Sequence, residues 1–212
     1  QCLSITRRLG PRLLEQEARF MRYLEKQGKL NRAIEFLPSD DEIAERKALG
    51  GERGCLTTPE RAVLLAYCKM WLFDEILASD LPEDEWVAAA LARYFPATLR
   101  ERMAAYIPRH PLQREIVATH VLNSMVNRVG ATFAHRITEM TSAKPAQVVR
   151  AYLLAREVFG VVGLWQSIEA LDNVVSDALQ AEMLIHEGWL TSRATTWFLR
   201  SRRLAEPMAA TM

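Results

Sequence analysis

The sequence predicts an all-α protein, and three observations lead to that prediction. Apolar residues recur every three to four positions through most of the chain, as they do along one face of a helix. No segment shows the period-two alternation of apolar and polar residues that is typical of a strand. The nine glycines and nine prolines fall mostly between the periodic segments. Since a chain of 212 residues can bury about 70% of its unfolded surface, we expect one domain of about eight helices.

The first part of the chain carries clear signals for where helices begin and end. A first helix is expected over Arg12–Gln27, and Gly28 ends it because glycine readily adopts the left-handed conformation found after a helix. Ser39 and Glu42 have the spacing of a capping box, in which each side chain bonds the other residue's backbone N–H. This box predicts a short helix that ends near Leu49.

The next predicted helix, Pro59–Leu77, is apolar almost all the way round. Thr58 supplies an N-cap, and Pro59 is a favoured first-turn residue. A helix that is apolar on every face is usually buried, so we expect this one to be the most buried of the domain. Three of its side chains are expected to be largely inaccessible: Leu65, Trp71 and Leu72.

Prolines and glycines divide the rest of the chain into further helices. We expect them at Glu83–Tyr94, Pro96–Tyr106, Pro111–Arg128, Ala131–Met140, Pro145–Phe159, Gly163–Leu171 and Ala178–Arg203. A division near Ser142–Lys144 would split these helices into two sub-bundles. The predicted domain covers residues 1–204, and residues 205–212 are expected to form a frayed tail.

Composition excludes several classes of protein. Lysine and arginine total 27 against 26 acidic residues, and the resulting net charge of +1 argues against a nucleic-acid partner. No apolar run approaches the roughly 18 residues that cross a membrane, so we expect no membrane partner. The cysteines Cys2, Cys55 and Cys68 match neither a disulfide framework nor a zinc motif. This usage fits a reducing compartment and predicts a cytoplasmic protein.

No motif for catalysis or cofactor binding is found. The loop Gly50–Gly54 precedes a helix, which is where a phosphate would bind, but it lacks the lysine and hydroxyl residue of a P-loop. It does not match Gly-x-Gly-x-x-Gly either, and Glu52 would repel a phosphate. No serine lies in a Gly-x-Ser-x-Gly elbow. We therefore interpret the loop as a surface linker and assign no catalytic, cofactor-binding or metal-binding residue.

One polar face is a candidate binding site. His120, Asn123 and Asn127 are spaced i, i+3 and i+7 and share one side of a predicted helix. They could meet a ligand or partner domain, form a polar seam that is hydrogen-bonded within the domain, or be a face left in solvent. We expect the second, and no metal, because no histidine lies within four residues of another.

The last predicted helix combines arginines and aromatic residues, among them Arg193, Arg200, Trp189 and Trp197. This combination is found on helices that bind a membrane surface or a partner. Because the net charge of the chain is close to zero, we interpret it instead as a solvated face above a core stripe.

Several segments, in their order and spacing, resemble a known family. They are 30–46 (LNRAIEFLPSDDEIAER), 57–69 (TTPERAVLLAYCK), 74–82 (DEILASDLP), 93–96 (RYFP), 114–119 (REIVAT), 123–128 (NSMVNR), 150–152 (RAY) and 155–160 (AREVFG). Together they resemble the C-terminal helical domain of the large bacterial NAD-specific glutamate dehydrogenases. The resemblance covers about Gln1 to Arg203, nearly the whole chain.

The resemblance implies a parent enzyme of amino-acid metabolism. Such an oxidoreductase converts L-glutamate, NAD and water into 2-oxoglutarate, ammonia and NADH. Its catalytic residues and dinucleotide-binding domain lie upstream of the region that this chain resembles, so NAD is expected in the parent and no cofactor on this chain. The implied role of this chain is structural or regulatory. Its implied partner is the catalytic domain of the same polypeptide, in a parent that is a homo-oligomer.

Two departures from the family pattern are small: the loop Gly50–Leu56 looks longer, and Cys68 stands where alanine is common. The first residue is Gln1, which suggests a piece of a longer protein. The alternative is a stand-alone α-helical protein-interaction or regulatory module without enzymatic activity.

Overall fold

The structure, a computed structural model, describes residues 11–201, and within that range it has helices and no strand, which confirms the predicted fold class. The predicted tail 205–212 lies outside the described residues. The longer helices are α2 (Pro11–Lys26), α3 (Asp40–Leu49), α4 (Thr58–Leu77), α8 (Gln113–Val129), α9 (Phe133–Thr141), α10 (Pro145–Val158), α11 (Val161–Glu169) and α12 (Asp177–Arg200). Shorter elements are η1 (Gly51–Arg53), η2 (Leu81–Glu83), α5 (Glu85–Ala88), α6 (Ala90–Tyr94), α7 (Ala97–Arg102) and η3 (Ile107–Arg109).

The predicted capping box of α3 forms, and the N-cap of α4 lies one residue before its predicted place. At the start of α3, Ser39 N–H donates to Glu42 Oε2 at 2.7 Å, and Glu42 N–H donates to Ser39 Oγ at 3.2 Å. The N-cap of α4 is Thr57 rather than Thr58, because Thr57 has extended backbone geometry and its hydroxyl accepts the N–H of Glu60. Glu60 returns the contact by accepting the N–H of Thr57 at 2.7 Å.

The chain between α4 and α8 has shorter helices than the sequence predicts. The segment Glu83–Tyr94 is divided among η2, α5 and α6. Asp84 starts the new helix, since its Oδ1 accepts the backbone N–H groups of Trp86 and Val87. The helix predicted over Pro96–Tyr106 is also shorter and forms α7. Proline positions indicate where these segments start, but the sequence does not reveal the extra cap inside them.

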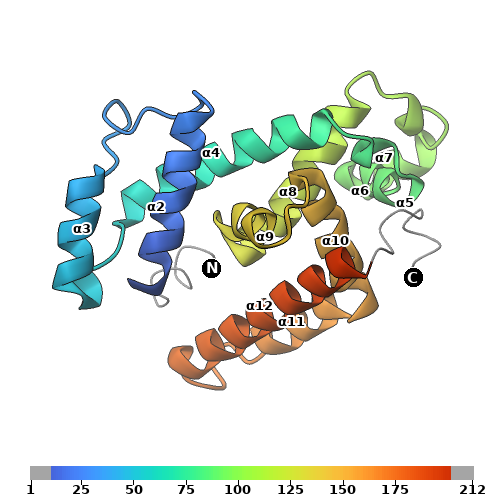
Figure 1. The fold of residues 1–212 in the computed structure, drawn as a ribbon. Helices are drawn as coiled ribbons and strands as arrows, with labels where there is room; N and C mark the ends of the chain where they lie inside the picture. The colour runs from blue at the N-terminus through green and yellow to red at the C-terminus, as the bar shows by residue number, and fades with distance from the viewer. Residues whose placement is uncertain (1–10, 202–212) are drawn as a thin grey trace.

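The most buried helix is α10, which corrects the prediction for Pro59–Leu77. Along α10 the run Ala151–Ala155 is buried without interruption, because α10 packs against α4, α8, α9, α11 and α12. In Figure 1, α4 extends from α2 and α3 at one end to α5, α6 and α7 at the other. One cluster of buried residues continues from Leu14 to Phe198, so the core is continuous across Ser142–Lys144. Within residues 11–201, no helix combines the length and apolarity needed to cross a bilayer.

One side of α4 faces solvent despite its apolar composition. Trp71 and Leu72 are fully buried, as predicted, whereas Leu65 is only half-buried and Met70 is 53% exposed. The neighbours of α4 cover only part of its circumference, so a face of alanine, methionine and leucine is left partly uncovered. Composition alone does not distinguish such a helix from a central one.

An aromatic cluster joins α2, α4 and α9 in the core. Phe20 lies 5.3 Å from Trp71 and 5.1 Å from His135, measured between ring centroids. Tyr23 lies 4.8 Å from the same imidazole. Burial lowers the pKa of His135 below its ordinary value, with Glu139 opposing the shift and Arg19 adding to it. The imidazole is therefore neutral at pH 7 and packs as an aromatic ring.

Candidate functional site

A groove of 710 Å³ lies between α9 and α12, with the end of α8 and the beginning of α2 completing its walls. Its lining contains arginines and tryptophans, and no described residue that lines it is acidic. The six side chains that give the groove its character are Arg128, Arg136, Arg193, Arg200, Trp189 and Trp197. We call this set, with the cavity between them, the Arg–Trp groove.

The periodicity of α12 places these residues on one face. Trp189, Arg193, Trp197 and Arg200 follow each other at intervals of three to four residues, so they line one side of the helix. The opposite side is buried and includes Phe198. The helix packs against α10 and α11, and Figure 1 shows α12 and α11 lying side by side.

Arg136 is held in the groove by neutral groups. Its Nη2 donates to Ser192 Oγ at 2.9 Å, and its guanidinium lies 5.8 Å from the ring centre of Phe133. Burial lowers the pKa of Arg136, which still leaves an arginine protonated at pH 7. Among residues 11–201 no carboxylate comes within ion-pair distance of it, so its partners are a hydroxyl, an aromatic ring and the Sδ atom of Met140, which accepts from Arg136 Nη1 at 3.9 Å.

Arg128 differs from Arg136 because its charge is already neutralised. Its Nη1 lies 2.5 Å from Glu169 Oε1, and its guanidinium lies 4.6 Å above the ring of Trp165. Arg193 and Arg200 are exposed, and in the part of the chain that the structure describes neither forms an ion pair. The groove therefore has a net positive lining beside two indole rings that are 47% and 53% exposed.

The groove has the composition of a binding surface. Arginine and tryptophan are enriched at protein interfaces, where they supply much of the binding energy. The described lining has no Asp, Glu, His, Cys, Lys or Tyr side chain, so the hydroxyls of Thr132, Ser192 and Thr196 have no general base beside them in it. The last helix is thus a core stripe on one side, as predicted, but its other side lines a groove instead of lying freely in solvent.

The polar face predicted on α8 differs from the prediction in its hydrogen bonds. His120 and Asn123 are half-buried, and Asn127 is exposed. The expected hydrogen bonds are not found: within residues 11–201 none joins these three side chains to another group. His120 instead lines a second cavity, of 280 Å³, beside Arg93 and Arg156. No group of three or more His, Cys, Asp or Glu side chains among the described residues is arranged to hold a metal ion.

The glycines of the loop before α4 are explained by a tight turn. Gly50 and Gly51 have φ values of 61° and 55°, which favour glycine. A Cβ on Gly54 would lie 2.8 Å from the Cα of Gly50, so the turn also excludes a side chain there. No strand leads into the loop, in contrast to phosphate-binding loops.

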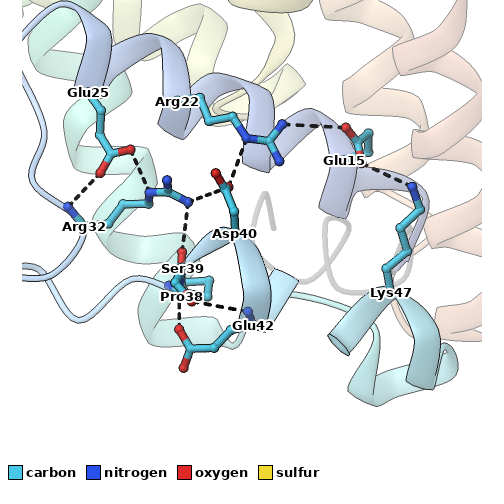
Figure 2. A network of polar contacts seen from close by, with 9 residues as sticks. All are labelled: Glu15, Arg22, Glu25, Arg32, Pro38, Ser39, Asp40, Glu42 and Lys47. Carbon is cyan, nitrogen blue, oxygen red and sulfur yellow. Dashed lines mark hydrogen bonds and ion pairs between the residues drawn. The ribbon is translucent and has the colours of Figure 1, made fainter. Parts of the chain in front are cut away.

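Sequence reasoning missed a polar network that fastens the loop between α2 and α3 (Figure 2). Arg32 Nε donates to Glu25 Oε2 at 2.8 Å, and its Nη1 donates to Asp40 Oδ1 at 3.0 Å and to the carbonyl of Pro38 at 3.2 Å. Arg22 donates to the same Asp40 oxygen at 3.0 Å. These residues lie in or beside segment 30–46, so part of its distinctive composition is structural.

Comparison with known proteins shows the family of this chain. The family described as "Glutamate dehydrogenase, C-terminal" matches residues 53–212. The chain belongs to this family. The NAD-specific glutamate dehydrogenase of Pseudomonas aeruginosa is 41% identical over 203 residues, and those of Halomonas elongata and Mycobacterium tuberculosis are 39% identical over 202 and 197 residues. The matches cover 96%, 95% and 93% of this chain but 12% of each relative's length.

Membership of the glutamate dehydrogenase C-terminal family confirms the resemblance seen in the sequence. The matched range contains α4 and every helix after it, and hence most of the Arg–Trp groove and the whole His120 cavity. Among the described residues, α2, α3, the first two residues of η1 and the network of Figure 2 precede it.

Proposed function

We propose that this chain is the C-terminal helical domain of an NAD-specific glutamate dehydrogenase and that it has a structural role there. The whole enzyme converts L-glutamate, NAD and water into 2-oxoglutarate, ammonia and NADH. The observation that carries the proposal is a match over nearly the whole chain to three proteins of that name, each of which is covered to 12% of its length. The catalytic residues and the NAD site then belong to other parts of the polypeptide.

The chemistry of the described residues supports a structural role. Hydride transfer needs a dinucleotide held at the carboxyl ends of strands against a glycine-rich turn, and residues 11–201 have no strand. A lysine that activates a substrate should be desolvated. Lys26, Lys29, Lys47 and Lys144 are exposed, and Lys69 is half-buried on α4.

The Arg–Trp groove is the surface that we propose packs on the catalytic domain of the same polypeptide. Two arguments favour that occupant: most of each relative's length lies outside this region, and a cationic groove with exposed indoles is complementary to an acidic, partly apolar surface. The same proposal includes a homo-oligomeric, cytoplasmic enzyme. Scattered cysteines that match no disulfide framework favour the cytoplasm.

The test uses the whole enzyme and the 212-residue chain side by side. Calorimetry of the chain with NAD should show no micromolar binding, and NADH absorbance should not increase with glutamate and NAD present. In the whole enzyme, Arg193→Glu should reverse one charge of the groove and weaken assembly or solubility, with Arg109→Glu as an exposed control. Turnover by the chain alone would overturn the structural role. An unchanged assembly in Arg193→Glu would overturn the assignment of the groove.

The stand-alone interaction module is the second candidate, and the same groove would be its binding surface. The similarity to three glutamate dehydrogenases favours the domain role over this alternative.

A further inference from the structure

The cavity beside His120 is lined by more positive than negative side chains. It has a volume of 280 Å³ and lies where α5, α6, α8, α10 and the beginning of α11 meet. Two cations reach it from different helices, Arg93 from α6 and Arg156 from α10. Ser124 and His120 add a hydroxyl and an imidazole from α8, and Trp86 forms part of the wall.

Arg156 is held in place without a carboxylate partner. Its Nη1 donates to Ser124 Oγ at 2.5 Å, while its Nε is buried and has no hydrogen-bond partner. Over residues 11–201, neither Arg156 nor Arg93 forms an ion pair. Arg150 on the same helix shows the usual arrangement, since it pairs with Asp84 at 3.0 Å and with Asp80 at 3.4 Å. A half-buried guanidinium that lines a cavity and has no carboxylate partner is the arrangement expected where an anionic ligand supplies the opposite charge.

Both arginines affect the pKa of His120. Burial lowers its pKa below the ordinary value, and the positive charges of Arg156 and Arg93 lower it further. The imidazole is therefore neutral at pH 7 in this cavity and can donate or accept one hydrogen bond at each nitrogen. An anion between the two arginines would screen their charge and raise the pKa of His120.

The remaining groups around the cavity leave room for one small anion. The ionisable groups of its lining are Arg93 on α6, His120 on α8, and Arg156 and Glu157 on α10, while α5 and α11 contribute Trp86, Val87 and Val162. The Glu157 side chain is exposed and opposes an anion from the rim. A volume of 280 Å³ equals that of about nine water molecules, which suits a phosphate or small dicarboxylate and is too small for a dinucleotide.

We propose that this cavity binds a small oxyanion of the phosphate or carboxylate class, held by Arg93 and Arg156 with hydrogen bonds from Ser124 and His120. Arginine suits this role because its planar fork can donate two parallel hydrogen bonds to two oxygens of one phosphate or carboxylate. The inference goes beyond the proposed function and does not rest on it, since the site would bind the anion whether the chain is a domain of an enzyme or a separate module.

The experiment is a calorimetric titration of the 212-residue chain with inorganic phosphate and, separately, with succinate, at constant ionic strength. We expect saturable binding of at least one of the two, and the comparison shows which oxyanion the cavity prefers. Arg93→Gln should weaken that binding by about tenfold or more, because a charge-assisted hydrogen bond is worth about that factor. Arg109→Gln removes an exposed arginine elsewhere and should leave the affinity unchanged.

A second readout follows the imidazole directly. In an NMR titration, the pKa of His120 should increase when the bound anion is present, and this increase should disappear in Arg156→Lys, which keeps the charge but loses the fork. Arg93 is exposed, so Arg93→Gln should fold normally. No saturable binding of either anion, or equal affinities of the unmodified chain and Arg93→Gln, would overturn the proposal.

Discussion

Glu17 on α2 and Arg61 on α4 form an ion pair inside the core, with Glu17 Oε1 3.0 Å from Arg61 Nε and the two residues only 2% and 4% exposed. Burial raises the pKa of Glu17 above its ordinary value even though Arg61 lowers it, so desolvation outweighs the attraction of the partner. Glu17 Oε2 and Arg61 Nη2 have no hydrogen-bond partner. A buried pair of this kind does little for net stability but strongly penalises the loss of one partner.

Removing one member of this pair should therefore be more damaging than removing both. Glu17→Ala leaves a charged guanidinium in the core, and we expect the free energy of unfolding to fall by about 3–5 kcal/mol. The double variant Glu17→Met with Arg61→Leu should recover most of that loss, because well-packed apolar residues replace a pair that was costly to desolvate. Urea unfolding followed by circular dichroism measures both.

Glu15 on the same helix is the matched control for that experiment. Its carboxylate pairs with Arg22 at 3.9 Å and Lys47 at 3.4 Å at the surface, so Glu15→Ala should change stability by less than about 1 kcal/mol. If Glu15→Ala and Glu17→Ala lower stability equally, burial does not decide the effect of losing a partner.

His135 should make the protein less stable as the pH falls. Its folded-state pKa lies below the ordinary value, so between those two values the unfolded chain binds a proton that the folded chain does not. Stability from this group is therefore fully present above about pH 6.5, the ordinary pKa of histidine, and is lost as the pH falls through the folded-state pKa. Thermal unfolding at a series of pH values should show this decline.

A variant isolates the contribution of His135 from those of other groups. His135→Gln should be less stable at pH 7 because it disrupts the aromatic cluster, but its stability should decrease less steeply between pH 6.5 and 5. The lowered pKa of His120 adds a slope of the same sign. An unchanged slope in His135→Gln would show that its imidazole does not titrate differently in the folded state.

Arg32 should be the most sensitive residue of the network in Figure 2, because one half-buried guanidinium reaches Glu25, Asp40 and the carbonyl of Pro38. Arg32→Ala should lower the free energy of unfolding by about 1.5–3 kcal/mol, the range for hydrogen bonds to charged groups. Arg32→Lys should recover only part of that loss, since an ammonium group cannot reproduce the fork.

The neighbouring Arg22 provides the comparison for Arg32. Its side chain is more exposed, and it shares Asp40 with Arg32, so Arg22→Ala should lower stability by less than about 1 kcal/mol. Hydrogen bonds from Arg32 and then Arg22 lower the pKa of Asp40. The stabilisation from Asp40 is therefore present above its ordinary pKa and is lost as the pH falls through the lowered value. In Arg32→Ala, NMR should find a higher pKa for Asp40.

The fold class and most helices could be predicted because they depend on local patterns: the period of apolar residues, capping boxes and prolines. Burial depends on which neighbours cover a helix, and that information is not local. For this reason Leu65 and Leu72, on one apolar helix, differ in burial, and α10 is more buried than α4. Glu17 occupies a position in the apolar stripe of α2, which is a visible sequence signal for a buried charge, although its partner is 44 residues away.

The binding surfaces were harder to predict, for the same reason. His120 is visible as a polar residue on a helix face, but Arg93 and Arg156 lie on other helices and only the packing of α6, α8 and α10 brings them to it. Likewise the arginines and tryptophans of α12 could be seen in the sequence, whereas the opposing wall with Arg136 comes from α9.

Substitutions on the two faces of α12 should differ in how much they lower the free energy of unfolding. Trp197 and Phe198 are adjacent in sequence, yet Trp197 is 53% exposed at the groove and Phe198 is 3% exposed in the core. Phe198→Ala should lower the free energy of unfolding by about 3–5 kcal/mol, because it removes a ring that the core cannot refill. Trp197→Ala should lower it by about 0.5–1.5 kcal/mol, because this half-exposed indole loses little more than its edge-to-face contact with Phe198, at 5.0 Å between ring centroids.

The same pair separates folding from binding in the whole enzyme. Trp197→Ala should lower the thermal midpoint of the 212-residue chain much less than Phe198→Ala does but weaken assembly of the enzyme, because an exposed indole beside Arg193 is suited to contribute binding energy at an interface. Thermal unfolding of the chain and analytical ultracentrifugation of the enzyme measure the two effects. If Trp197→Ala destabilises the chain as much as Phe198→Ala does, the indole supports the fold, and the groove is not a free binding surface. If neither stability nor assembly changes, the catalytic domain packs elsewhere.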